Sequence, residues 1–230
     1  MKVAIMQPYL FPYIGYWQLI NAVEQFVIFD DVNFIKKGFI NRNNILVDAE
    51  PKRFTLQLVK ASQNKLINET EVGENASEIL KLIEINYQNA PYYQDVFPIL
   101  KDILMQNEKN LARFIGYSLF KLSEYMGIYT HFIYSSQIEK NNTLKSQDKI
   151  IEICKKMQAT EYVNAIGGRS LYESGAFRQN GLELYFLESL KIEYKQFQNE
   201  FVPNLSIIDI LMFNDKSNIK HALNNYSLTN

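Results

Sequence analysis

Residues 1–31 read MKVAIMQPYLFPYIGYWQLINAVEQFVIFDD, and this stretch decides the fold. Two short apolar runs, at residues 3–6 and 26–29, lack polar alternation, which predicts two buried strands, at 2–6 and 26–29. Between them, apolar residues at helical spacing predict a helix over residues 16–23. A strand, a helix and a second strand in this order form a βαβ unit, whose two strands are parallel.

The segment QPYLFPYIGY joins the first strand to the helix. Pro8 and Pro12 fix their own φ angles and remove two backbone donors, so the segment is a stiff loop. Ligands of open parallel sheets bind outside the carboxyl ends of the strands. Gln7 follows the first strand and Asp30 and Asp31 follow the second, so we expect these segments to meet at one edge and form one cavity.

Beyond this unit the chain alternates between strand and helix patterns. Strands are expected near 53–59, 130–134, 161–168 and 181–188, and helices within 76–126, over 148–157 and from about 206. The prediction is an α/β fold with a parallel or mixed sheet, an N-terminal βαβ unit of the nucleotide-binding type and a helical middle segment. We expect one domain over residues 1–230 with a helical insertion at about 76–127, in which FVPNLSIIDILMFND ends the ordered part.

Composition excludes several classes of protein. Hydrophobic residues make up 47% of the 230 residues, which is enough to build a core. A net charge of −1 argues against a dedicated nucleic-acid binder, and the single cysteine, Cys154, cannot form an intramolecular disulfide. The apolar run at the start is too short for a signal peptide, and no run reaches the roughly 20 residues that cross a bilayer. We expect a cytoplasmic protein without membrane insertion.

Asp30 and Asp31 are the candidate catalytic residues. Adjacent carboxylates at the end of a strand can orient hydroxyl groups or hold a cation. Neighbouring side chains of a strand point in opposite directions, so only one of the two is expected to enter a site. The alternative is that one of them caps a turn and the other faces water.

Two further clusters are candidates for substrate binding. KKGFINRNNIL contributes Lys37, Asn41, Arg42 and Asn43, which suit a phosphate or carboxylate ligand, but a solvated loop is an equal alternative. AIGGRSLY places Gly168, Arg169 and Ser170 after a predicted strand, where backbone amides can bind an anion. Most Gly-Gly turns are simply turns.

Other residue types are interpreted as structural. Ser206 and Asp209 have the spacing of a helix cap, with Asp209 completing a capping box. His131 and His221 are isolated, and Cys154 lies on the apolar face of a predicted helix, where an inert thiol is expected. No metal site is predicted. Catalysis would therefore depend on Asp, Lys, Arg, Tyr and Asn side chains and on backbone groups.

In order along nearly the whole chain, MQPYLFPYIGYWQLI, FVIFDDVNFIKKGFINRNNIL, YVNAIGGRSLY, GLELYF and FVPNLSIIDILMFN resemble the WbqC-like family. The resemblance adds emphasis on Gly15, Tyr172, Ser206 and Asp209. Phe39 stands where family members often have tryptophan. The family is associated with gene clusters for bacterial O-antigen and other surface polysaccharides. A weaker likeness to nucleotidylyltransferases places Tyr13, Gly15 and Tyr16 at their HxGH signature, but without its histidines.

The resemblance implies a role in the surface-polysaccharide pathway, and our hypothesis is a group transferase, acyl or aminoacyl, that acts on a nucleotide-linked amino sugar without a cofactor. An acyl donor or a carrier protein would be a second partner. In this hypothesis Lys37 and Arg42 hold an anion, Asp30 or Asp31 serves as a base, and Gln7, Tyr9 and Tyr16 line the pocket. The alternatives are a non-catalytic protein that binds a sugar nucleotide or a partner in the same pathway, and a nucleotidylyltransferase.

Overall fold

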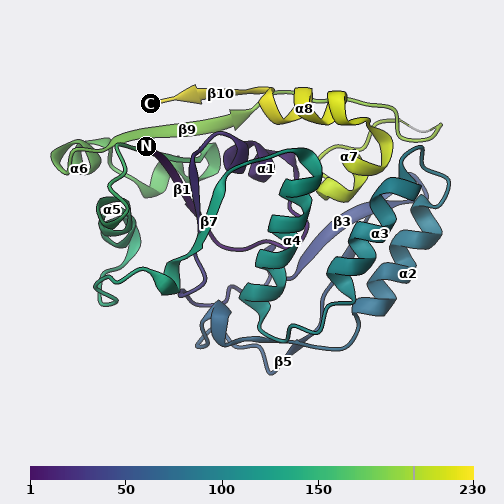
Figure 1. Cartoon of the computed structure of the whole chain (residues 1–230), viewed down its shortest axis with the longest axis horizontal. Coiled ribbons are helices and arrows are strands. Elements are labelled where there is room, and N and C mark those ends of the chain that lie inside the picture. Colours follow the sequence, from purple (N-terminus) through teal and green to yellow (C-terminus); the bar gives the residue numbers. More distant parts are fainter. Residues whose placement is uncertain (199) are drawn as a thin grey trace.

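The computed structural model of the chain describes residues 1–198 and 200–230, and its centre is a six-stranded sheet (Figure 1). Across the sheet the order is β10 (Tyr226–Thr229), β9 (Glu183–Ser189), β8 (Glu161–Ala165), β1 (Lys2–Met6), β2 (Gln25–Ile28) and β7 (His131–Tyr134). β10 pairs antiparallel with β9, and every other neighbouring pair is parallel. The predicted α/β fold with a mixed sheet is confirmed.

The strand order contains a topological switch point. From β1 the chain moves outward to β2 and then β7, and it returns to the other side of β1 with β8 and β9. This is the order of doubly wound sheets that bind nucleotides, in which ligands occupy the crevice where the order reverses. Here that crevice lies outside the carboxyl ends of β1 and β8.

Helices cover both faces of the sheet, which explains the unbroken apolar runs of β1 and β2. Val3, Ile5 and Val27 pack in a core with α5 (Ser146–Lys156) and α6 (Ser174–Gln179). Ala4 and Phe26, which alternate with them, pack in the larger core on the other face. That core includes α1 (Ile14–Asn21), α7 (Ile207–Phe213) and α8 (Lys216–Asn224).

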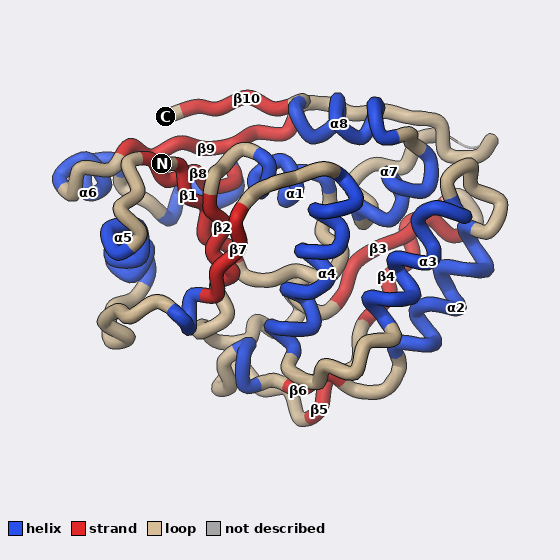
Figure 2. The backbone as a smooth tube through the Cα atoms, viewed as in Figure 1, coloured by secondary structure: helices blue, strands red, loops and turns tan. Residues whose placement is uncertain are grey.

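A long insertion separates β2 from β7. Its elements are β3 (Arg42–Val47), β4 (Glu50–Thr55), β5 (Leu58–Val59), η1 (Ile67–Glu69), β6 (Glu71–Val72), α2 (Ala76–Tyr87), α3 (Tyr93–Leu104) and α4 (Leu111–Met126). The β3–β4 hairpin stands apart from the main sheet (Figure 2). Gly127, in the left-handed region with φ 73°, ends α4, and the chain then enters β7. Among the described residues, no helix is long and apolar enough to cross a membrane.

The structure corrects several expected element boundaries. The strand expected near 53–59 is divided between β4 and β5, and α1 begins two residues earlier than expected, at Ile14. The helix expected to start at Asp148 begins at Ser146, so Asp148 lies in its first turn. The ordered part does not end with α7, because α8 and β10 follow it. α8 is amphipathic and packs on α1, a contact that depends on tertiary structure.

Ser206 and Asp209 have different roles from each other. Ser206 Oγ accepts from the amide of Ile208, which confirms the predicted helix cap. Asp209 does not complete a capping box: it is fully buried and accepts hydrogen bonds from the Tyr87 and Tyr194 hydroxyls and from Gln196 Nε2. Burial raises the pKa of Asp209, and these three hydrogen bonds oppose that shift. Asp209 thus connects α7 to α2 and to the segment that precedes α7, which contains Tyr194 and Gln196.

Candidate functional site

The carboxyl edge of the sheet brings the ends of β1 and β2 together. Met6 is paired with Ile28 in parallel register, and the Phe29 amide donates to the Met6 carbonyl at 2.8 Å. Gln7 and Asp30 therefore lie at the same edge, as expected from the sequence. β7 is parallel to β2 and ends at the same edge, so the residues after Tyr134 join this region.

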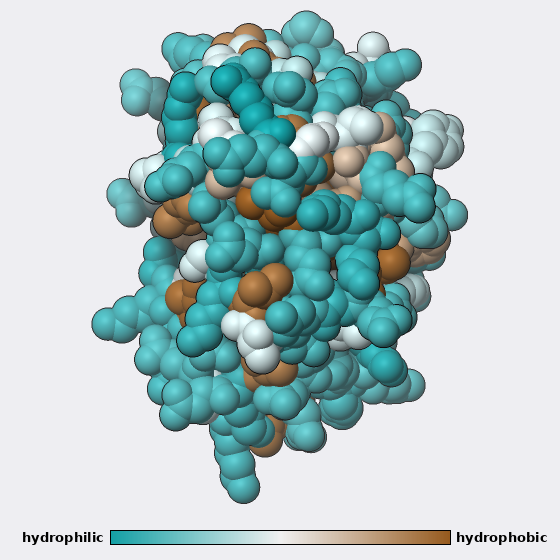
Figure 3. Space-filling view, turned by 90° about the vertical axis from the view of Figure 1, so that its left-hand side faces the viewer, coloured by the Kyte–Doolittle hydropathy of each residue, from teal (hydrophilic) through white to brown (hydrophobic). Residues whose placement is uncertain are grey.

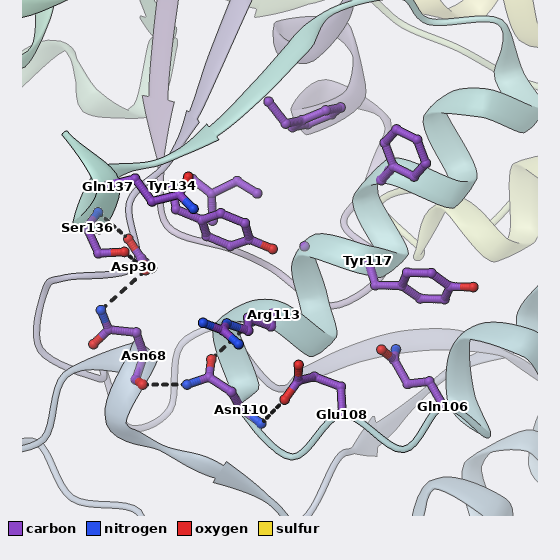
Figure 4. A pocket seen from close by; sticks show the side chains of 14 residues that line it. Asp30, Asn68, Gln106, Glu108, Asn110, Arg113, Tyr117, Tyr134, Ser136 and Gln137 are labelled. Carbon is purple, nitrogen blue, oxygen red and sulfur yellow. Dashed lines mark hydrogen bonds between the residues drawn. The ribbon is translucent and has the colours of Figure 1, made fainter.

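Asp30 lines a cavity of about 720 Å³ between the sheet edge and α4 (Figure 4). We call it the Asp30 cavity; its other lining residues are Ile28, Asn68, Gln106, Glu108, Asn110, Arg113, Gly116, Tyr117, Phe120, Phe132, Tyr134, Ser136 and Gln137. They come from β2, β7, the insertion and the turn η2 (Ser135–Gln137). The volume is in the range of small-molecule sites, about 300–1,000 Å³.

The Asp30 carboxylate is held in one orientation. Oδ1 accepts from the Ser136 amide at 2.9 Å, and Oδ2 accepts from the Ser136 hydroxyl at 2.6 Å. Asn68 Nδ2 donates to the same Oδ2 at 3.3 Å. Since each carboxylate oxygen can accept two hydrogen bonds, one acceptor position on Oδ1 is left for a ligand. Asp30 is 3% exposed, so a ligand group that hydrogen-bonds to it is shielded from water at that contact.

A hydrogen-bonded floor connects Asp30 to the start of α4. Asn110 Nδ2 donates to the Asn68 carbonyl at 2.5 Å, and the Asn110 amide donates to Glu108 Oε1 at 2.8 Å. Asn110 also caps α4, because its Oδ1 accepts from the Arg113 amide at 3.1 Å. The Arg113 side chain rises from this floor, between the Asp30 and Glu108 sides of the cavity (Figure 4). None of the ion pairs among the described residues involves Arg113.

Tyr134 places a neutral hydroxyl in the cavity. Burial raises its pKa, the charges of Asp30 and Glu108 raise it further, and Arg113 opposes them. The hydroxyl therefore remains a donor at neutral pH. The cavity lining thus provides two carboxylates, one guanidinium and two phenols, of which the Tyr117 hydroxyl donates to Asp102.

Apolar side chains form another part of the Asp30 cavity, beside the polar Gln106 and Gln137. Ile28 and Phe132 come from the sheet, and Phe120 is 56% exposed on α4. Aromatic walls beside a few polar groups suit a ligand with a flat apolar face and hydroxyl groups at its edge, such as a sugar ring.

Asp31 lies in a different environment. It lines a second cavity of about 580 Å³, which we call the Lys149 cavity. Its Oδ2 pairs with Lys140 Nζ at 2.7 Å and with Lys149 Nζ at 3.3 Å. Burial alone would raise the pKa of Asp31, but Lys140, the Ser135 hydroxyl and Lys149 together outweigh burial and hold this pKa below its ordinary value. The two carboxylates diverge as predicted, yet each lines a cavity.

The proline loop lines neither of these cavities. Tyr9 lines a third cavity, of about 320 Å³, with Pro12, Tyr13, Phe39, Asn43 and Asn204. The single cavity expected from the sequence is thus divided. The reason is the buried Tyr16 ring, whose centroid is 5.5 Å from those of Tyr9 and Phe26 and which fills the space between them. The Tyr16 hydroxyl donates to the Gln7 carbonyl.

The KKGFINRNN cluster is dispersed in the structure. Lys37 is exposed in the left-handed region, with φ 66°. Asn41 donates to the Leu56 carbonyl, and Arg42 Nε donates to the Gly38 carbonyl at 2.7 Å. Asn43 donates to the carbonyls of residues 10 and 11. None of these residues lines the Asp30 cavity.

The Gly-Gly segment forms the turn η3 (Ile166–Leu171). Gly168 packs against Asn164, and Ser170 is exposed. Arg169 lies over the Phe186 ring and donates to the Asn230 carbonyl. This segment is on the β8 side of the sheet and does not join the Asp30 cavity.

Reasoning from the sequence missed Arg113, Glu108, Tyr134 and Ser136. Tyr134 and Ser136 carry a usable signal. Tyr134 ends a predicted strand and Ser136 follows it, so the strand-end rule that selected Asp30 also points to them. Glu108 and Arg113 carry no such sequence signal, because they reach the cavity only through the packing of α4.

Comparisons with known proteins agree with the extent of the fold. The WbqC-like protein family matches residues 7–221. Over 215 residues, the chain is 28% identical to Rv1507c, an uncharacterized protein of Mycobacterium tuberculosis, and this covers 91% of this chain and 92% of that protein. No solved structure matches the chain significantly.

Proposed function

The chain belongs to the WbqC-like protein family, and we propose that it is a cytoplasmic group transferase whose reaction takes place in the Asp30 cavity. Its acceptor is a nucleotide-linked amino sugar used for a bacterial surface polysaccharide, and the transferred group is acyl or aminoacyl. The donor is an activated acyl compound or a carrier protein. The observation that carries this proposal is the buried carboxylate of Asp30, fixed by Ser136 and Asn68 in a cavity that also contains Arg113.

Asp30 supplies the base that acyl transfer requires. The amine nitrogen of the acceptor attacks the carbonyl carbon of the donor, a C–N bond forms, and the bond to the leaving group breaks. The nitrogen must lose one proton, which passes to the free acceptor position on Asp30 Oδ1. General bases of this kind contribute about 10²–10⁴-fold to rates.

The other polar groups match the remaining parts of such a substrate. Arg113, at the start of α4, is placed to hold a phosphate of the nucleotide, because its guanidinium can bind oxyanions bidentately. Glu108 and the Tyr134 hydroxyl are available to sugar hydroxyls. Phe132 and Phe120 offer faces on which a sugar ring can pack.

The proposal is tested with Asp30→Asn and the matched control Asp48→Asn, which alters an exposed aspartate in the β3–β4 turn. Product formation from nucleotide-linked amino sugars and acyl donors is followed by mass spectrometry, and affinity by calorimetry. We expect Asp30→Asn to lose at least about 100-fold in turnover and to keep its affinity within about threefold.

Other outcomes favour other functions. Wild-type turnover by Asp30→Asn contradicts the role of this residue. Binding of the sugar nucleotide without product from any donor favours a non-catalytic binding protein. Release of pyrophosphate from a nucleoside triphosphate favours nucleotidylyl transfer.

A further inference from the structure

The Lys149 cavity lies on the opposite side of β2 from the Asp30 cavity. Its lining includes Asp31 after β2, Lys145 before α5, Lys149 in α5 and Tyr172 after η3. It thus extends from the end of β2 to the chain that leaves β8, across the end of β1. That position is beside the switch point of the sheet, where doubly wound folds bind their ligands.

Two lysines, Lys145 and Lys149, line this cavity with one carboxylate, Asp31, and Lys140 pairs with that carboxylate from outside the lining. The side chains of Lys140 and Lys149 are 2% and 9% exposed, and they share one oxygen of Asp31. One carboxylate offsets one of these two buried ammonium groups, and Lys145 adds a third at the exposed rim. Three positive charges and one negative charge leave an excess of two. Asp148 is exposed and does not line the cavity.

Buried charge without a counter-charge is costly, since the ammonium ion has lost its hydration. Lys149 reduces this cost by lying 5.2 Å from the centre of the Phe29 ring. Its ammonium donates to the Asp31 carbonyl and to Asp31 Oδ2, which leaves one of its three N–H groups for a ligand.

The start of α5 adds donors to the same cavity. Ser146 and Gln147 line it, and the side chain of Lys145, the capping residue, satisfies none of the first amides of the helix. The first N–H groups of a helix have no partner within the helix, and they carry partial positive charge. These N–H groups, like the lysines, therefore favour an anion in this cavity. The side of the molecule that carries α5 and α6 is largely hydrophilic (Figure 3).

We propose that the Lys149 cavity binds a phosphoryl group, with Lys149, Lys145 and the first amides of α5 as its donors. A phosphoryl dianion offsets the excess of two positive charges, which a single carboxylate does not. The site is separate from the Asp30 cavity, and it does not depend on the reaction proposed there. A phosphoryl ligand here would be either free phosphate or pyrophosphate, or part of a nucleotide.

Calorimetric titration of the full chain tests this site without any measurement of activity. The probes are pyrophosphate, UDP and uridine, and the decisive variant is Lys145→Ala, because Lys145 is exposed and its loss leaves the fold intact. Lys156→Ala, at the other end of α5, is the control for loss of the same charge. We expect Lys145→Ala to bind pyrophosphate about tenfold more weakly, as for one charge-assisted hydrogen bond. Lys156→Ala should bind as the wild type does.

The probes also separate the sources of the phosphoryl group. Binding of UDP but not pyrophosphate assigns the site to a nucleotide, and equal binding of both assigns it to free phosphates. No binding of either at millimolar concentration refutes the site. Loss of binding in Arg113→Ala together with unchanged binding in Lys145→Ala also refutes it, because the phosphoryl group would then occupy the Asp30 cavity.

Discussion

Removal of the Asn43 side chain is expected to loosen the proline loop. Asn43 is 3% exposed and donates to the Phe11 carbonyl at 2.8 Å and to the Leu10 carbonyl at 3.3 Å. Ser206 Oγ donates to the same Phe11 carbonyl at 2.8 Å. Phe11 itself has φ 46°, a conformation that costs free energy and persists only where the surroundings hold it.

The loss of stability in each variant depends on which carbonyl groups lose their hydrogen-bond donors. In Asn43→Ala the buried Leu10 carbonyl loses its donor, while the Phe11 carbonyl keeps the Ser206 hydroxyl. We therefore expect the free energy of unfolding to fall by about 2–3 kcal/mol. Ser206→Ala removes one bond to Phe11 and the helix cap, which costs about 1–2 kcal/mol. In the double variant the Phe11 carbonyl has neither donor. Its cost should exceed the sum of the single costs by about 1–2 kcal/mol.

Equilibrium unfolding in urea measures these values as a double-mutant cycle. The control is Asn86→Ala, which removes a partly buried amide bonded only to the Leu82 carbonyl in its own helix, and it should cost less than either buried variant. Additivity of Asn43→Ala and Ser206→Ala to within about 0.5 kcal/mol would refute the reasoning. It would mean that the two side chains do not share the Phe11 carbonyl.

Two further predictions concern buried carboxylates. Asp209→Asn turns an amide NH₂ toward the donors Tyr87, Tyr194 or Gln196, so unfolding in urea should show a loss of about 2–4 kcal/mol; a loss below about 1 kcal/mol would contradict this network. The pKa of Asp31 is lowered in the folded state, so its contribution to stability is present above its ordinary value of 3.8 and is lost as pH falls through the folded value. The difference in the free energy of unfolding between wild type and Asp31→Asn should therefore shrink below about pH 4. A constant difference from about pH 7 to about pH 3 would show that the ionised Asp31 does not contribute this stability.

Much of the sheet could be predicted from the sequence because its strands are buried on both faces. VAIM and FVIF are continuous apolar runs, and their covering by helices on each side requires that composition. The C-terminal elements lack this signal. β10 is a short edge strand of partly exposed residues, and its pairing with β9 is a contact between distant parts of the chain. Helix α3 contains Pro98 in its interior, although proline is normally tolerated only in the first turn of a helix.

The candidate site was predictable only in part. A carboxylate after a buried parallel strand has its position fixed by the sheet, so the placement of Asp30 and Asp31 at the edge follows from local pattern. Arg42 and Lys37 were favoured because they follow closely in sequence, but the turn before β3 directs Arg42 to the Gly38 carbonyl. Ser136 follows a predicted strand, but Asn68, Glu108 and Arg113 come from the insertion, and no local pattern encodes how that insertion folds back.

The most direct test of the Asp30 cavity is the affinity of nucleotide-linked amino sugars for Gly116→Ala. A Cβ at Gly116 would overlap the Tyr134 hydroxyl and lie 2.9 Å from Tyr134 Cζ, so it forces this ring to move and narrows the cavity. Alanine favours the helix over glycine by about 1 kcal/mol, which helps to preserve the fold. The control is Gly175→Ala, where a Cβ meets nothing within 4 Å. We predict at least about tenfold weaker binding by Gly116→Ala and unchanged binding by Gly175→Ala; wild-type affinity in a folded Gly116→Ala would show that the ligand binds elsewhere.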